Sequence, residues 1–197
     1  MYQILLDSSN KFLSVGLAND GKVIDRVFYE AWQRQSEMMT SELSNILEKN
    51  KINIKDIDGV VIGKGPGSYT GVRIAITIGK TLAYALNCKI YGVSSLSLLK
   101  TPEKPTICIV NARSGRSYFA VYNNKEVIVP DCVKTNEEVL KYIDEHRDYA
   151  VNGEVEHLSL KSGEYDIIEN LASSISKENI VQTPFELKPI YLKELTK

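Results

Sequence analysis

Residues 57 to 86 constrain the fold more than any other part of the chain, because a short apolar run, a glycine-rich turn and a long apolar helical pattern follow one another without a break. The turn, residues 63 to 71, contains four glycines and one proline, and Ser68 or Thr70 can cap the helix that follows. Such a turn directs backbone N–H groups outward, where the helix dipole favours an anion. The sequence therefore predicts an α/β protein with a shaped turn at the carboxyl end of a buried strand.

Length and charge limit the classes of protein that this chain can belong to. The chain has 197 residues, of which 43% are hydrophobic and 25% charged, so one or two compact domains are expected. The net charge of −1 argues against an autonomous nucleic-acid-binding protein, and a partner would have to supply most of the affinity for any RNA. No apolar run is long enough to span a membrane, and the first ten residues do not have the pattern of a signal peptide. We expect a cytoplasmic protein without membrane contact.

The first half of the chain has the pattern of an antiparallel meander followed by alternating helices and strands. The expected strands cover residues 2–7, 12–18, 22–29, 57–62 and 89–93, and the expected helices cover residues 36–49 and 72–86. Asp20-Gly21 is a good two-residue hairpin turn, and Ser36 is placed to cap the first helix. The order βββαβαβ predicts a first domain over residues 1–101.

The second half repeats this pattern in a shorter form. Pro102 and Pro105 mark a linker, and strands are expected over residues 106–110, 117–122 and 125–129. Thr135 and Glu138 have the spacing of a capping box ahead of a helix, and a last helix is expected near residues 169–176. We predict a second, shorter domain over residues 102–197, whose last helix can pack back on the first domain. The three cysteines, Cys88, Cys108 and Cys132, are widely spaced, which predicts buried reduced thiols.

The helix expected over residues 72–86 is apolar on two faces. One face carries Val72, Ala75, Ile76, Ala83 and Leu86, and the other carries Ile74, Ile78, Leu82 and Ala85. A central sheet covers only one face of a helix, so the second face requires another helix or another protein. Packing against the helix of residues 36–49 and contact with a partner protein both satisfy this requirement, and they can coexist.

The sequence contains no obvious catalytic group. His146 and His157 are the only histidines, and their spacing does not place two metal ligands on one helix face. Ser68 lies in a sequence that lacks the G-x-S-x-G pattern of a serine nucleophile, so a peptidase finds no support among these residues.

Several motifs together resemble one known family. Residues 65–73 read Gly-Pro-Gly-Ser-Tyr-Thr-Gly-Val-Arg, residues 79–86 read Gly-Lys-Thr-Leu-Ala-Tyr-Ala-Leu, and residues 92–96 read Gly-Val-Ser-Ser-Leu. With Leu-Asp-Ser-Ser at 6–9, Asn-Ala-Arg at 111–113, Tyr118 and Pro-Ile-Tyr-Leu-Lys at 189–193, these segments closely resemble the TsaB family, also called YeaZ. That family belongs to the machinery that makes threonylcarbamoyladenosine in tRNA.

The resemblance implies an actin-like (ASKHA, ribonuclease H-like) fold of two small domains, each with a mixed sheet flanked by helices. It also implies a non-catalytic subunit, without a required cofactor, that binds and activates the TsaD transferase. A TsaE-like ATPase joins the bacterial complex, which brings in tRNA indirectly, and an adenine nucleotide can lie near the subunit interface. An exposed pair of apolar helices also predicts a homodimer of the isolated chain. The two helices of the first domain match those of the family that contact TsaD, which gives as candidate partner-binding residues Met39, Leu43, Ile46, Val72, Ile74, Ile78, Leu82 and Ala85.

Nucleotide binding by the chain itself stays open. In actin-like kinases and ATPases the first hairpin carries an acidic residue and small hydroxyls that receive phosphate and metal, and Asp7-Ser8-Ser9 corresponds to that hairpin. The second hairpin has Asn111 where those enzymes have another aspartate, so one charge that orients a metal is missing. An autonomous nucleotide-dependent ATPase or kinase is therefore the alternative function, and Asp7 and Ser9 could equally cap a turn. The candidate contacts for a nucleotide or another anion are Asp7, Ser9, Gly67, Ser68, Thr70 and Arg73.

Overall fold

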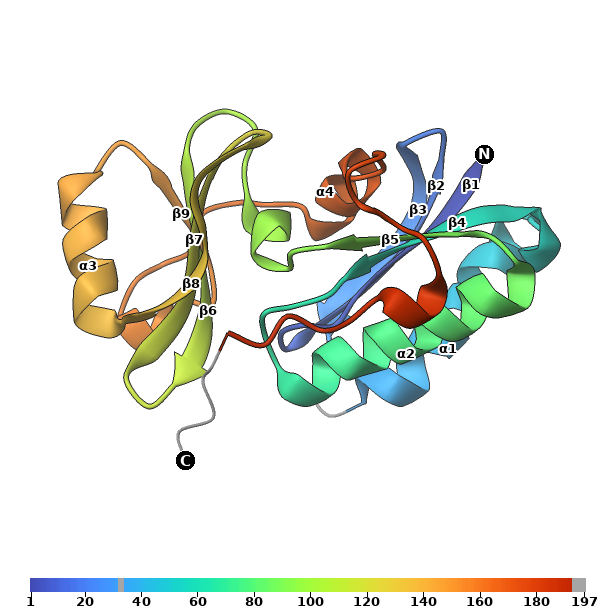
Figure 1. Ribbon diagram of the computed structural model, residues 1–197, viewed down its shortest axis with the longest axis horizontal. Helices are drawn as coiled ribbons and strands as arrows, with labels where there is room; N and C mark the ends of the chain where they lie inside the picture. The colour runs from blue at the N-terminus through green and yellow to red at the C-terminus, as the bar shows by residue number, and fades with distance from the viewer. Residues whose placement is uncertain (32–33, 193–197) are drawn as a thin grey trace.

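The computed structural model describes residues 1–31 and 34–192 of the chain. Two sheets lie at opposite ends of an elongated molecule, and helices cover their faces (Figure 1). Within the described residues, no helix is both long enough and apolar enough to cross a membrane.

The first sheet is mixed and has the strand order β10-β5-β4-β1-β2-β3. The meander β1–β2–β3 is antiparallel, whereas β4 pairs parallel to β1, and β5 pairs parallel to β4. Asp20 and Gly21 form the turn between β2 and β3 with φ angles of 49° and 77°, as expected for a hairpin turn of the Asp-Gly type. The strands are β1 (Tyr2–Asp7), β2 (Phe12–Asn19), β3 (Lys22–Glu30), β4 (Ile57–Gly63), β5 (Lys89–Val93) and β10 (Ile180–Val181).

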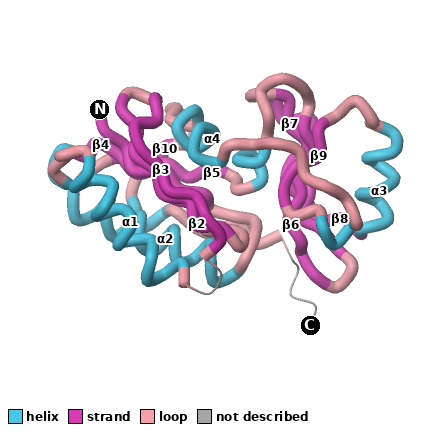
Figure 2. The backbone as a smooth tube through the Cα atoms, turned by 180° about the vertical axis from the view of Figure 1, so that it is seen from behind, coloured by secondary structure: helices cyan, strands magenta, loops and turns pink. Residues whose placement is uncertain are grey.

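Two long helices, α1 (Gln35–Lys49) and α2 (Tyr69–Leu86), lie side by side on one face of this sheet (Figures 1 and 2). The Ser68 hydroxyl caps α2 by accepting the N–H of Gly71 at 3.3 Å, whereas Thr70 lies inside the helix. The prediction that Ser36 caps α1 is wrong, because the helix begins one residue earlier and its N-cap residue, Arg34, makes no capping hydrogen bond through its side chain.

The second sheet repeats the connections of the first, with a meander, a helix and then a strand parallel to the first strand. Its order is β8-β7-β6-β9, and α3 covers its outer face. The expected capping box at the start of α3 is confirmed: the Thr135 hydroxyl accepts the N–H of Glu138 at 3.2 Å, and the Glu138 carboxylate accepts the N–H of Thr135 at 2.7 Å. The elements are β6 (Thr106–Arg113), β7 (Arg116–Asn123), β8 (Glu126–Thr135), α3 (Asn136–Glu145) and β9 (Ala150–Gly153).

The structure differs from several of the predicted elements. Helix α2 begins at Tyr69, three residues before the expected start, and β6 extends to Arg113. Strand β8 continues past Pro130, which the sheet tolerates because β8 is an edge strand. Strands β9 and β10 are too short for the periodicity to indicate them. The last α-helix, α4 (Ile167–Ser173), begins two residues earlier than expected because Asp166 caps it. Four 3₁₀ turns complete the described elements: η1 (Ile54–Asp56), η2 (Leu96–Leu99), η3 (Glu156–Leu158) and η4 (Pro184–Glu186).

Three apolar clusters hold the layers together. One lies between the first sheet and α1 with α2, and a third lies between the second sheet and α3. The middle cluster joins the first sheet, η2 and α4 to the inner face of the second sheet. All three cysteines are free; Cys108 is buried, and the other two are partly buried.

The chain returns to the first sheet after the second sheet is complete. Helix α4 packs against β1 to β4 on the face opposite α1 and α2, and β10 then pairs with β5. Residues 184–192, which we call the C-terminal strap, then follow α2: the Phe185 ring meets the Tyr84 ring edge-on at 5.4 Å, and Leu187 is buried in the first cluster. Because α4 and β10 lie beyond residue 101 and yet pack on or pair with the first sheet, the division into domains at residue 101 stays a prediction.

Candidate functional site

The glycine turn between β4 and α2 packs directly on the loop of the first hairpin. A Cβ atom on Gly67 would lie 2.2 Å from the carbonyl oxygen of Ser9, and one on Gly71 would lie 1.9 Å from that of Ser8. The Ser68 N–H donates to the Ser9 carbonyl at 2.6 Å. Glycine is therefore required for close backbone approach. The prediction of outward-directed N–H groups is wrong for Ser68 and Gly71, since both of these N–H groups are used within the protein.

Asp7, at the end of β1, is buried behind this hairpin. Its Oδ1 accepts the N–H and the hydroxyl of Ser9 at 3.1 and 2.9 Å, and its Oδ2 accepts the Ser95 hydroxyl at 3.1 Å. Burial raises the pKa of Asp7 to about 6, although these hydrogen bonds oppose the shift. The carboxylate holds the hairpin loop, is 1% exposed and is not among the residues that line the neighbouring cavity, which corrects its assignment as a contact for a nucleotide or anion.

The five other candidate contacts line one cavity of about 730 Å³ between the two sheets. These residues are Ser9, Gly67, Ser68, Thr70 and Arg73. Five further large side chains of the wall were not among the predicted contacts: Tyr69, Arg113, Tyr118, Glu154 and Tyr191. Four of these, all except Glu154, lie in segments that carry the family resemblance, which was the available signal.

Arg73 points along the mouth of this cavity between two tyrosines. Its guanidinium carbon lies 3.9 Å from the centroid of the Tyr69 ring, and its Nε donates to the Tyr191 hydroxyl at 2.8 Å. The rings of Tyr69 and Tyr191 stack at 5.6 Å. Within residues 1–31 and 34–192, Arg73 has no carboxylate partner.

Glu154 is the acidic residue of the cavity wall. Its Oε2 accepts the N–H of Asn111 at 3.2 Å, and burial raises the pKa of the carboxyl. Glu154 therefore anchors the second hairpin to the loop after β9. No group of three residues with metal-binding side chains occurs in the part of the chain that the structure describes.

The two histidines lie in the second half of the molecule, away from the glycine turn. His157 Nε2 lies 2.8 Å from the Ser117 hydroxyl, but Ser117 is fully buried, and its hydroxyl also lies 3.0 Å from Asn136 Oδ1. His146 stacks on Tyr142 at 4.0 Å. The Ser117–His157 pair therefore ties η3 to β7 and the start of α3, and its serine does not reach solvent.

Four of the candidate partner-binding residues are buried in the core. Each has at most 4% of its surface exposed: Met39, Leu43, Ile46 and Val72. Their side chains fill the space between the helices and the first sheet. This corrects the prediction that they contact a partner, because helical periodicity identifies an apolar face but not what covers it.

The other four candidates form a strip on α2 that the sheet does not cover. Ile74, Ile78 and Leu82 are partly buried at the edge of the first cluster, and Ala85 is exposed. We call these four residues the outer strip. Helix α1 lies beside α2 (Figure 2), and the strip is still partly open to solvent, so both predicted partners of this face, a neighbouring helix and another protein, remain compatible with the structure.

Comparison with known proteins gives consistent results. The sequence model described as "TsaD: tRNA N6-adenosine threonylcarbamoyltransferase" matches residues 29–190. The "tRNA threonylcarbamoyladenosine biosynthesis protein TsaB" of Bacillus subtilis is 32% identical over 136 residues, which are 65% of this chain and 59% of that protein. The Escherichia coli protein of the same name is 31% identical over 130 residues, 62% of this chain and 55% of that protein. The matched segments thus span less than two thirds of these relatives.

A solved structure extends the likeness over the whole fold. YeaZ from Pseudomonas aeruginosa superimposes with a TM-score of 0.85 at 21% identity, covering 97% of this chain and 99% of that one. The two mixed sheets, their helices and this match give the actin-like, ribonuclease H-like fold that the motifs predicted. The chain belongs to the TsaD family and, within it, to the TsaB (YeaZ) group.

Proposed function

We propose that this chain is a non-catalytic subunit of the complex that forms N6-threonylcarbamoyladenosine in tRNAs reading codons that begin with A, and that it binds and activates a TsaD-like transferase. Its TsaB relatives are named as biosynthesis proteins of this modification. The role of an activating subunit goes beyond those names and rests on the surface of α2.

The observation that carries the proposal is the outer strip. Three large aliphatic side chains on α2 are only partly buried, and Ala85 next to them is exposed. An incompletely buried apolar strip on a helix is typical of a surface that another protein covers.

The hairpins support a role without catalysis. Asp7 points into the protein and not into the cavity, and the second hairpin offers Asn111 in place of a second carboxylate. A metal-dependent phosphoryl transfer needs carboxylates that face the phosphates. The alternative function is an autonomous actin-like ATPase or kinase, which would have to bind its nucleotide in the cavity beside these hairpins. Calorimetry of the isolated chain with ATP and magnesium separates the two: tight binding with turnover that Asp7→Ala abolishes would favour the enzyme.

In the proposed complex the chain requires no cofactor of its own. A TsaE-like ATPase joins the assembly in the cytoplasm, most of the affinity for tRNA comes from the partners, and an adenine nucleotide lies at the subunit interface.

Light scattering after size-exclusion chromatography tests the proposal, with this chain mixed with the TsaD-like protein of the same organism. We expect a stable heterocomplex. Ile78→Glu and Ala85→Glu should weaken it at least about tenfold, because each buries a charge at the interface. The matched control is Leu140→Glu on α3, where a leucine that is 41% exposed lies far from the strip.

Folding of each variant is checked by circular dichroism. A folded Ala85→Glu variant that binds the partner as tightly as Leu140→Glu would remove the strip from the interface. A wild-type chain that ignores the transferase, or that binds it without raising tRNA modification, would contradict the proposed function itself.

A further inference from the structure

Among the described residues, the side chains that line the cavity between the hairpins carry an excess of positive charge. Three charged side chains line it: Arg73, Arg113 and Glu154. The Arg73 guanidinium contacts Tyr69 and Tyr191, and within the described residues neither Arg73 nor Arg113 forms an ion pair. The Glu154 carboxylate accepts the backbone N–H of Asn111 in the second hairpin. The cavity therefore favours an anionic ligand.

The wall of the cavity is also aromatic. Tyr69 and Tyr191 are 59% and 50% exposed, and their stacked rings form one edge of the cavity, while Tyr118 lines it from the second sheet. Exposed tyrosines beside arginines are the usual platform for an unpaired nucleic-acid base. A volume of about 730 Å³ lies within the range of pockets that hold small ligands or single groups.

The geometry does not suit a nucleoside triphosphate with its metal ion. The N–H groups of Ser68 and Gly71, which could cradle phosphates, donate within the protein. The Asp7 carboxylate, which could hold the metal, is 1% exposed and bonded to Ser9 and Ser95. Two arginines without a metal ligand match the single charges of a phosphodiester chain better than a chelated triphosphate.

We propose that the cavity holds one unpaired nucleotide of the tRNA that the complex modifies. The base lies against Tyr69, Tyr118 and Tyr191, and the flanking phosphates contact Arg73 and Arg113. This inference rests on the proposed function. It is compatible with the net charge of −1, because the partners supply most of the affinity for RNA and the cavity adds one local contact.

Steady-state kinetics of the assembled complex tests the inference. Arg113→Gln should raise the KM for tRNA about tenfold, with kcat and the affinity for the transferase unchanged, since the loss affects a phosphate contact and not the reaction. The matched control is Arg147→Gln, an exposed arginine near the end of α3 that pairs with Asp144. Tyr191→Leu should also raise the KM, and Tyr191→Phe, which keeps the ring, should restore most of the affinity.

Other outcomes overturn the inference. An unchanged KM in both Arg113→Gln and Tyr191→Leu excludes the cavity as an RNA contact. If Arg113→Gln weakens binding of the transferase, and the complex that still forms has an unchanged KM for tRNA, the cavity contacts a protein partner instead. Binding of ATP or AMP to the isolated chain that Arg113→Gln abolishes, with the KM for tRNA unchanged, assigns it to a free nucleotide.

Photo-cross-linking separates this inference from the proposed function. In tRNA that carries photoreactive nucleotides in its unpaired loops, we expect cross-links to peptides that contain Tyr69, Tyr118 or Tyr191. If the wild-type chain forms no complex with the transferase, the proposed function fails. In that case, cross-linking of photoreactive tRNA to the isolated chain at high concentration still tests whether the cavity binds RNA. If no cross-link forms to any of these peptides, the inference is wrong.

Discussion

At the residue scale, Asp7 links the first hairpin to the glycine turn. Its two carboxylate oxygens accept three hydrogen bonds, from Ser9 and Ser95, and the Ser95 hydroxyl in turn accepts the N–H of Gly65. Because the carboxyl is fully removed from solvent, burial raises its pKa to about 6. The charged form is thus less favourable in the native state than in the unfolded chain.

This shift predicts a stability that depends on pH. The unfolded carboxyl titrates near 3.8 and the native one near 6, so the native state binds more protons between these values and loses stability as pH rises through them. Asp7→Asn has no such titration. Between pH 4 and 7 the free energy of unfolding of the wild type should fall by about 2 kcal/mol relative to Asp7→Asn. Urea unfolding at several pH values measures this difference, and parallel curves for the two proteins would contradict the assigned pKa.

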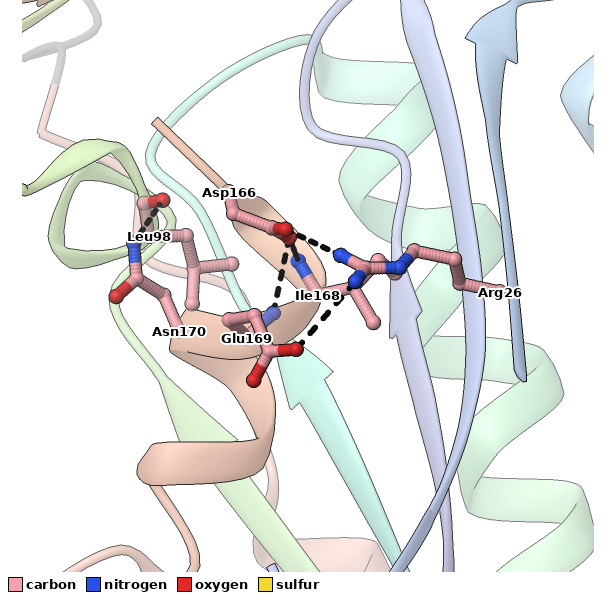
Figure 3. A network of polar contacts seen from close by, with 6 residues as sticks. All are labelled: Arg26, Leu98, Asp166, Ile168, Glu169 and Asn170. Atoms are coloured by element: carbon pink, nitrogen blue, oxygen red, sulfur yellow. Dashed lines mark hydrogen bonds and ion pairs between the residues drawn. The ribbon is translucent and has the colours of Figure 1, made fainter. Parts of the chain in front are cut away.

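At the element scale, α4 shows how a short helix is fixed far from its neighbours in sequence. Arg26 of β3 pairs with Asp166 and with Glu169 in its first turn, and the Asn170 amide donates to the carbonyl of Leu98 at 2.9 Å (Figure 3). Below these polar contacts, Ile168 is fully buried. A Cβ atom on Gly16 would lie 2.8 Å from the Ile168 side chain, so a residue without a side chain is needed opposite it.

The apolar contact should dominate the attachment of α4. Arg26→Gln is expected to cost less than about 1 kcal/mol, because the side chains of this ion pair are largely exposed to solvent. Ile168→Ala is expected to cost about 3 kcal/mol, since it leaves a cavity in the middle cluster. Chemical denaturation of both variants measures the two losses in unfolding free energy and shows which is larger. A larger loss in Arg26→Gln than in Ile168→Ala would show that the ion pairs, and not the apolar contacts, hold the helix.

At the scale of the whole molecule, the outer strip predicts self-association. Without a partner, two copies can cover their strips by the same α1–α2 surface in an isologous dimer. Sedimentation velocity of the isolated chain should detect a dimer that Ala85→Glu shifts toward the monomer by at least about tenfold in dissociation constant. The TsaD-like transferase should compete for the same surface and convert the dimer to a heterocomplex. A dimer unaffected by Ala85→Glu would use a different surface.

The sequence determined the type and order of most elements, because periodicity, capping and turn residues act over a few positions. The strand–glycine turn–helix unit, the Asp20-Gly21 hairpin and the Thr135 capping box are local patterns of this kind. Five of the six candidate anion contacts line the cavity for the same reason, since the turn and the first hairpin place them near each other.

Only the tertiary structure decided which parts of these elements are available to a ligand or partner. Met39 and Ile78 both belong to apolar helix faces, but only the packing of the sheet shows that Met39 is buried and Ile78 is not. Asp7 has the sequence context of a phosphate-binding hairpin, yet the Ser95 hydroxyl, 88 residues away, accounts for its inward position. The contact of Arg73 with Tyr191, 118 residues apart, exists because the C-terminal strap returns to α2. Such contacts depend on how the chain closes on itself, and local periodicity carries no information about that closure.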